Sequence, residues 1–93
     1  MAKIILPSSL TRVTAGEKVF VTGASVLGAA LTELLVAYPE LKPYLYAHNG
    51  ALAPYLSMFI NGTDMRDLEG IDTELKAEDE VSLILATAGG WYR

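Results

Sequence analysis

The residues of this chain best suited to chemistry are two glycines near its end. Gly89-Gly90 follows an apolar, strand-like run, and Trp91-Tyr92-Arg93 comes after it. Because neither glycine has a Cβ, the segment is thin and can adopt almost any backbone conformation. It could therefore pass through a narrow channel and present a carboxyl group to a buried active site. Fully extended, residues 85–90 would reach roughly 17 Å. An ordinary C-terminal turn is the competing interpretation.

The other side chains offer little chemistry. The chain has no cysteine, which excludes a disulfide scaffold, a cysteine nucleophile, a thiolate zinc site and an iron–sulfur cluster. The single histidine, His48, lies in a polar stretch beside Asn49 and Gly50, where a solvated position is the usual role. No second histidine could complete a metal site or a catalytic triad. We therefore expect no catalytic residue, no metal site and no bound cofactor.

Charge narrows the choice of partner. Acidic residues gather between positions 64 and 80, but their spacing does not fit an EF-hand loop, so a solvated rim used for solubility or docking is expected. The net charge is −4, and the seven basic residues form no cluster. Nucleic-acid binding normally needs a basic patch. We expect no nucleic-acid partner, and a basic protein surface suits this chain better because opposite charge steers association.

Length and composition indicate one globular domain. The chain has 93 residues, of which 52% are hydrophobic and 19% charged. No apolar run approaches the ~20 residues that span a bilayer. The first ten residues, MAKIILPSSL, lack the long apolar segment and the cleavage site of a signal peptide. These features predict a cytoplasmic protein with no membrane partner.

Strands must position the glycine tail. Short apolar or alternating runs predict strands at residues 2–7, 17–23, 55–62 and 80–86. The first two strands are expected to be antiparallel, joined by a hairpin connection rich in Ser, Thr and Gly. Asn61-Gly62 predicts a tight turn. The region that follows it is expected to be mostly turns, with one short strand near Met65.

One helix should cover the sheet. From Val26 the apolar residues recur with a helical period, and their stripe comprises Leu27, Ala30, Leu31, Leu34 and Leu35. Ser25 is a candidate N-cap, and Pro39 predicts the end of the helix. Gly28 is expected to let the helix approach the sheet. A short helical turn is expected over residues 41–46.

The order strand, strand, helix, strand, irregular segment, strand predicts an α+β fold. It is typical of a β-grasp, or ubiquitin-like, roll with a mixed sheet packed on one main helix. Within that fold the first and last strands would lie parallel at the sheet centre, and their apolar runs KIIL and VSLIL agree with such a position. Residues 1–86 would form this domain, and residues 87–93 a flexible tail.

Strand alternation also predicts a binding surface. It turns Phe59 and Ile84 to the side of the sheet away from the helix, near the root of the tail. Together they would form a small apolar patch for a partner protein. In the alternative interpretation, residues 38–54 fold over them and make a second, minor core.

These features together resemble the MoaD/ThiS family of ubiquitin-like sulfur carriers, and the resemblance covers most of the chain. Beyond the element order, it rests on the FING strand end at residues 59–62, the acidic lead-in and strand KAEDEVSLIL at residues 76–85, and the ATAGG tail at residues 86–90. The long region of residues 38–54 makes the chain more similar to the CysO-type carrier and the small subunit of molybdopterin synthase than to thiamin-type carriers.

The resemblance implies that Gly90 is the working terminus, approached through Ala88 and Gly89. In the family, an enzyme related to ubiquitin-activating enzymes adenylates the terminal glycine carboxylate with ATP. Sulfur then replaces the adenylate, and the resulting thiocarboxylate donates sulfur in the biosynthesis of cysteine, molybdopterin or another metabolite. The chain would be a substrate rather than an enzyme, with an adenylating enzyme and a sulfur-accepting synthase as partners.

Two features depart from the family pattern. Leu85 and Ala86 stand where the family often has a proline before the tail. The larger departure is that Gly90 is locked in a peptide bond to Trp91. Family members with such an extension are trimmed by a JAMM-type zinc metalloprotease, which implies here a precursor that loses Trp91, Tyr92 and Arg93.

Two alternatives to the carrier remain open. One is a β-grasp binding module that is never activated, whose Trp91, Tyr92 and Arg93, being typical interface residues, dock into a partner. The other is a ubiquitin-like protein modifier conjugated to lysines through Gly90.

Overall fold

The structure is a computed structural model that describes residues 1–85. Predictions about the tail, residues 86–93, lie outside the described residues. Most elements lie close to the expected positions. Strands and helices occupy β1 (Ala2–Ile5), β2 (Val19–Thr22), α1 (Leu27–Ala37), α2 (Lys42–Leu45), β3 (Leu56–Ile60), β4 (Thr63–Asp64) and β5 (Glu80–Leu85). Short 3-10 turns occupy Ser8–Leu10, Pro39–Leu41, Met65–Asp67 and Gly70–Asp72.

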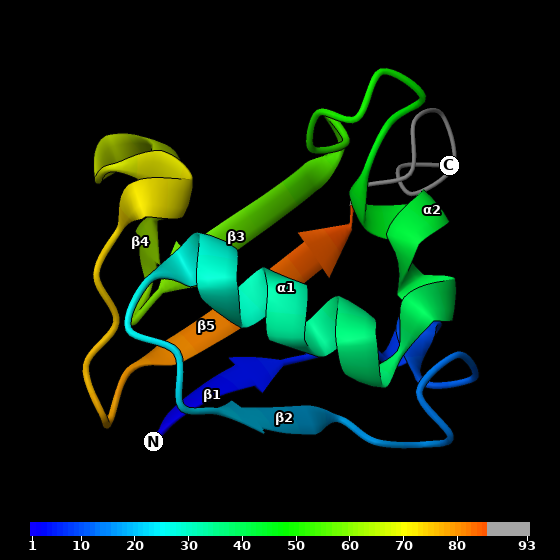
Figure 1. The fold of residues 1–93 in the computed structure, drawn as a ribbon, viewed down its shortest axis with the longest axis horizontal. Coiled ribbons are helices and arrows are strands. Elements are labelled where there is room, and N and C mark those ends of the chain that lie inside the picture. Colours follow the sequence, from blue (N-terminus) through cyan, green and yellow to red (C-terminus); the bar gives the residue numbers. More distant parts are fainter. Residues whose placement is uncertain (86–93) are drawn as a thin grey trace.

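The strands form one mixed sheet in the order β2-β1-β5-β3-β4 (Figure 1). The strand β1 pairs antiparallel with β2 and parallel with β5, and β3 pairs antiparallel with both β5 and β4. The last strand is therefore central and lies parallel to the first, as the sequence predicted. This connectivity, with α1 following the first hairpin, is the expected β-grasp roll.

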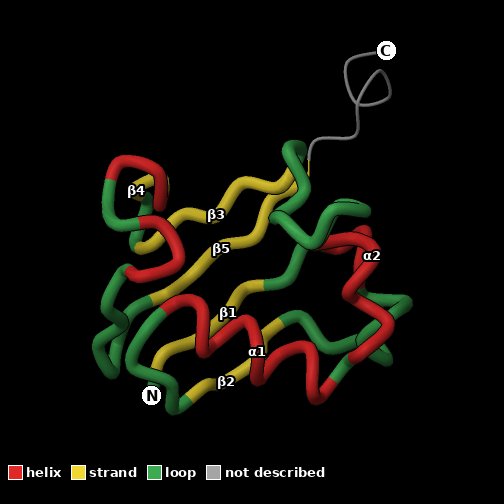
Figure 2. The backbone as a smooth tube through the Cα atoms, turned by 45° about the horizontal axis from the view of Figure 1, so that its top comes forward, coloured by secondary structure: helices red, strands yellow, loops and turns green. Residues whose placement is uncertain are grey.

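The core lies between one face of the sheet and α1, which crosses that face obliquely (Figure 2). The predicted helix stripe is buried, apart from the partly buried Leu35 at its edge. The alternating apolar residues of the two longest strands meet it, and all are buried: Leu56, Met58, Ile60, Val81 and Leu83. The apolar face of the helix and the apolar face of the sheet therefore pack against each other and form a single core.

The start of α1 differs from the prediction. The N-cap is Val26 rather than Ser25, and no side chain caps the helix. The N–H of Leu27 donates instead to the carbonyl of Thr73, at 2.9 Å, and the N–H of Leu75 donates to the carbonyl of Ser25, at 2.8 Å. A remote segment satisfies the helix start, so a local cap is not needed. The end of the helix at Ala37, before Pro39, is as predicted.

Gly28 has a different neighbour from the one expected. A Cβ at this position would lie 3.3 Å from the carbonyl oxygen of Ile71, so the glycine lets the helix approach the turn at Gly70–Asp72, not the sheet. The turn at Asn61-Gly62 is confirmed, and both residues have positive φ, 52° and 89°. The short strand expected near Met65 lies just before it, as β4.

Residues 38–54 pack on the helix side of the sheet. Leu41, Leu45 and Ala53 from this region are buried in the main core, and α2 lies beyond the end of α1 (Figure 1). Tyr38 contacts Phe20 of β2 edge to face, with ring centroids 6.2 Å apart. None of the helices formed by residues 1–85 is both long and apolar enough to cross a membrane.

Candidate functional site

The strand β5 is the support for the glycine tail. It pairs with β1 over residues 80–82 and with β3 up to Leu85, which lies opposite Leu56. The start of β5 is thus paired on both edges, and residues 83–85 are paired with β3. The predicted working residues, Ala88, Gly89 and Gly90, and the extension of Trp91, Tyr92 and Arg93, lie outside the described residues.

Phe59 and Ile84 lie on the side of the sheet away from α1. Ile84 pairs with Ser57, and Phe59 pairs with Ser82. The two apolar residues are therefore diagonal neighbours, roughly 7–8 Å apart. The side chain of Ile84 is 48% exposed and Phe59 is half-buried. Because residues 38–54 send Leu41, Leu45 and Ala53 into the main core, they do not bury Ile84 as a second core would.

The sheet extends this apolar surface beyond the two predicted residues. In the strand register, Ile5 of β1 lies opposite Val19 of β2 on one side and Ser82 of β5 on the other. Val21 of β2 lies opposite Lys3 of β1. Val19 and Val21 are exposed. We call the surface formed by Ile5, Val19, Val21, Phe59 and Ile84 the open face. The alternation of Val19 and Val21 with Phe20 and Thr22 is visible in the sequence, but only the strand order joins β2 to the face that carries Ile84.

The rim of the open face carries charge. Lys3 is opposite Glu80, and Asp64 is opposite Phe59. Asp64 accepts hydrogen bonds from the side chain of Arg66, the shorter at 2.7 Å, and from its backbone N–H. These bonds, with the side-chain bond dominant, lower the pKa of Asp64 to about 2. The carboxylate is thus ionised at neutral pH and limits the apolar surface on this side.

At the opposite end of β5 from the tail, a hydrogen-bonded network fixes the start of the strand. The amide of Asn61 donates to the carboxylate of Asp79 at 2.8 Å, and its oxygen accepts from the N–H of Glu80 at 3.0 Å. Asp79 also accepts from the N–H of Lys76 at 2.8 Å. The Lys76 N–H and then the Asn61 amide lower the pKa of Asp79. The β3–β4 turn is thereby tied to β5.

Within the described residues there is no group of three or more His, Asp or Glu side chains that could hold a metal ion. The acidic residues between positions 64 and 80 are mostly exposed, as expected for a solvated rim. His48 is also exposed, and it lines a cavity next to α2. Among the features described above, the open face is the surface that a partner protein could contact.

The sheet order, the single main helix and the central C-terminal strand define a ubiquitin-like β-grasp protein. Its family follows from the sequence: the sequence model of the ThiS family matches residues 4–90, so the chain belongs to the ThiS family. The match ends at Gly90, and Trp91, Tyr92 and Arg93 lie beyond it.

Curated relatives agree with this family. The sulfur carrier protein CysO of Mycobacterium tuberculosis is 27% identical over 89 residues, which cover 94% of this chain and 96% of that protein. A protein of Archaeoglobus fulgidus, provisionally named a sulfur carrier, is 45% identical over 42 residues. That match spans 45% of this chain and about half the length of the relative, 48%.

Solved structures agree with the fold. Small archaeal modifier protein 1 of Methanosarcina acetivorans is 28% identical and superposes with a TM-score of 0.82 over 96% of this chain and 95% of that chain. The BexX/CysO complex of Amycolatopsis orientalis contains a chain with a TM-score of 0.85 and 22% identity, covering 97% of this chain and 100% of that chain. At that identity the likeness concerns the fold alone.

Proposed function

We propose that this chain is a sulfur carrier that holds its sulfur as a thiocarboxylate on Gly90. The observation that carries the proposal is that the paired strand β5 leads directly into the segment where the family match ends. The strand is paired with β1 over residues 80–82 and with β3 up to Leu85, and the family match continues beyond the strand and stops at Gly90. The diglycine is thin enough to enter the active site of a partner enzyme.

The proposed chemistry begins with hydrolysis of the Gly90–Trp91 peptide bond by a JAMM-type metalloprotease. Water adds across the bond, the carboxylate of Gly90 is formed, and Trp-Tyr-Arg leaves with a free amine. Before this step the amide carbonyl of Gly90 has no carboxylate oxygen that could attack ATP. The full-length chain is therefore an inactive precursor.

Activation and sulfur transfer follow on the partner enzyme. A carboxylate oxygen of Gly90 attacks the α-phosphorus of ATP, and pyrophosphate leaves. A sulfide sulfur then attacks the acyl carbon, the bond to AMP breaks, and the thiocarboxylate remains on the chain. ATP is bound by the adenylating enzyme and not by the carrier. A sulfur-accepting synthase then takes the sulfur for cysteine, molybdopterin or another sulfur-containing metabolite.

The open face is the proposed docking surface for the adenylating enzyme. It combines the exposed Val19 and Val21 of β2 with the exposed Ile84 of β5, the strand that precedes the tail in the sequence. An enzyme that grips this face would hold β5 in a fixed position and bring Gly90 to its nucleotide. The net negative charge of the carrier favours a basic rim on such a partner.

The test compares two forms of the chain with the adenylating enzyme, ATP and sulfide. The form ending at Gly90 should gain the mass that corresponds to replacement of one oxygen by sulfur, and the full-length form should not. Protein isolated from its own host should include a species that lacks the last three residues. Equal reactivity of the two forms, or only full-length protein in the host, would contradict the proposal.

A second candidate is a protein modifier linked to lysines through Gly90. It is supported by the likeness to small archaeal modifier protein 1, at 28% identity over almost the whole chain. Both functions need the same trimmed and adenylated glycine. They separate in the host: a modifier leaves Gly90 in isopeptide bonds to lysines of other proteins, which peptide mass spectrometry detects.

A further inference from the structure

One edge of the sheet has no neighbouring strand among residues 1–85. The strand β2 is the outermost strand on its side, and Figure 1 shows no described helix or strand beyond it. An edge strand presents a row of unpaired backbone N–H and C=O groups, which is a template for pairing with another strand. The carrier chemistry does not use these groups. The outer side of β2, which we call the β2 edge, is therefore a candidate interaction surface.

The strand register shows which backbone groups point outward at the β2 edge. The N–H of Leu6 donates to the carbonyl of Lys18 at 2.8 Å, which continues the pairing of β1 with β2. In an antiparallel ladder, hydrogen-bonded pairs alternate with non-hydrogen-bonded pairs. Phe20 therefore bonds to β1, whereas the N–H and C=O groups of Val19 and Val21 point away from it. No segment among residues 1–85 outside the sheet forms a backbone hydrogen bond with either valine.

The side chains beside the β2 edge leave it accessible. Val19 and Val21 are 43% and 52% exposed and lie on the open face. Phe20 and Thr22 alternate with them on the helix side, where Thr22 is buried and Phe20 is half-buried. Lys18, directly before β2, falls on the helix side by the same alternation. The strand itself carries no charge, so no ionised group stands between the two valines.

The strand at the other end of the sheet, β4, is protected against such pairing. It has two residues, Thr63–Asp64, and Asp64 forms an ion pair with Arg66 at 2.7 Å. Short edge strands that carry charge discourage contacts between sheet edges. The exposed acidic residues of the segment 67–74 follow β4 in the chain, so two copies that met there would repel each other. A second copy of the chain therefore fits the β2 edge better.

We propose that β2 pairs with β2 of a second copy of this chain, antiparallel and about a two-fold axis through Phe20. Val19 of each copy would lie opposite Val21 of the other, and these two residues would exchange both of their backbone hydrogen bonds. Lys18 of each copy would lie opposite Thr22 of the other, so the two lysines stand at opposite ends of the contact. The edge is thus self-complementary in hydrogen bonding and in charge, as a two-fold symmetric interface requires.

The contact is small, and the pairing should be weak. It involves β2 and its immediate flanks, so its buried area belongs to the class of transient interfaces, below about 1,200 Å². We expect a Kd on the order of 0.1–1 mM. The chain would then be largely monomeric when dilute and mostly paired at about 2 mM.

The pairing would join two sheets into one. A two-fold axis perpendicular to the sheet leaves both α1 helices on one side and both open faces on the other. The two β5 strands would run in opposite directions, because β5 is parallel to β1 and β1 is antiparallel to β2. The joined open faces would offer a partner a larger apolar surface, a role that rests on the proposed function, whereas the pairing itself does not.

The test uses the full-length chain alone. Sedimentation equilibrium from about 0.05 to about 2 mM should show the mass rising from that of a monomer toward that of a dimer. Over the same range, amide hydrogen exchange at Val19 and Val21 should slow by about two- to fourfold. Exchange at Phe20 should stay unchanged, because its N–H already bonds to β1. Amide shifts that change with concentration should centre on β2.

The decisive variant is Val21→Pro. The N–H of Val21 points away from β1, so proline there removes no hydrogen bond within the monomer, and edge strands tolerate it. The Kd of the pairing should weaken by at least about tenfold. Val21→Thr is the matched control, because it keeps the N–H and a β-branched side chain, and it should pair like the unmodified chain. If a thermal melt shows that Val21→Pro unfolds, Val19→Lys keeps the backbone, places two charges in the contact and should weaken the pairing as strongly.

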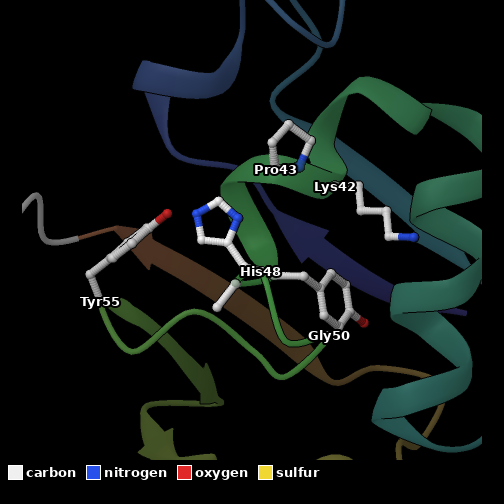
Figure 3. Close-up of a pocket in the computed structure, with 7 residues that line it drawn as sticks. Lys42, Pro43, His48, Gly50 and Tyr55 are labelled. Carbon is white, nitrogen blue, oxygen red and sulfur yellow. The ribbon is translucent and has the colours of Figure 1, made fainter.

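Three results would overturn the proposal. One is a monomeric mass at about 2 mM, ten times the tighter expected Kd or twice the weaker one. Another is a dimer that both Val21→Pro and Val19→Lys leave intact. The third is a set of concentration-dependent shifts confined to His48 and Tyr55, which line the cavity beside α2 (Figure 3). None of these measurements uses an enzyme, ATP or sulfide, so failure of pairing would leave the carrier function standing, and failure of sulfur transfer would leave the pairing unaffected.

Discussion

Replacing Ile84 by arginine tests whether the open face is the docking surface. The side chain is 48% exposed and points away from the core, so the arginine stem can lie on the sheet while its charge stays in water. Such exposed changes usually stay within about 0.5 kcal/mol, which shifts Tm by less than about 4 °C in a domain of this size. We therefore expect a folded, nearly unchanged protein.

Binding to the adenylating enzyme should be affected by Ile84→Arg much more strongly than stability is. A central interface residue commonly contributes 1–3 kcal/mol, which corresponds to a loss of affinity of roughly 5- to 150-fold. A titration with the adenylating enzyme, by calorimetry or anisotropy, measures this loss directly. Phe59→Arg should behave in the same way, because Phe59 is the diagonal neighbour of Ile84 on the open face.

Two variants serve as controls. Leu83→Arg moves the same charge one residue along β5 to the core face, where the side chain is 2% exposed. It should cost more than about 4 kcal/mol and unfold much of the protein, because a buried charge has no partner there. Val36→Arg adds the same charge on α1, at a residue that is 78% exposed, and should affect neither stability nor binding.

The stability and binding results of these variants show which part of the reasoning would be wrong. A large drop in Tm for Ile84→Arg or Phe59→Arg would mean that the open face is covered and works as a second core. An unchanged Kd in well-folded Ile84→Arg and Phe59→Arg proteins would mean that the adenylating enzyme grips another surface. Equal weakening by Val36→Arg would mean that the added charge, and not the site, is responsible.

Three further predictions concern stability and are measured by urea unfolding. Folding lowers the pKa of Asp79, so its contribution to the free energy of unfolding is present above the unfolded pKa of about 3.9 and is lost as the pH falls through the lower, folded pKa. The stability difference between the unmodified chain and Asp79→Asn should therefore narrow below about pH 4. A difference that stays constant with pH would contradict the role of the bond between Asp79 and Asn61. Gly62→Ala should cost roughly 1–2 kcal/mol, because φ is 89° and no atom lies close enough to clash; no loss would show that the turn changes type. Leu31→Ala should cost about 2–5 kcal/mol, because the side chain is fully buried, whereas Val36→Ala on the same helix should stay near zero; equal costs would contradict the orientation of α1.

Much of this fold could be predicted because its evidence is local. The helix stripe from Leu27 to Leu34 repeats every three or four residues, and the strands around Met58 and Leu83 alternate every two, so each element shows its buried side in its own sequence. Asn61-Gly62 likewise carries its own turn signal. The order of these elements predicted the β-grasp fold, and the parallel central pair was expected from that fold, with which the two apolar end strands agree.

The candidate site was predictable in part for the same reason. Alternation alone turns Phe59 and Ile84 away from the core. Whether they meet, and what joins them, depends on strand register, which no single segment contains. The pairing of β1 with both β2 and β5 brings Ile5, Val19 and Val21 onto the same face.

Contacts between distant segments were decided by the tertiary structure. Ser25 is a plausible cap by type, but the carbonyl of Thr73 already accepts from the helix start, so the local signal was overridden. Gly28 is small because a remote turn at Ile71 crosses the helix there. The cavity beside Tyr55 likewise exists because α2 packs next to the end of the sheet. The sequence by itself therefore determined the elements and their buried sides, since those depend on backbone periodicity, whereas caps, close approaches and surfaces shared by several strands needed the folded chain.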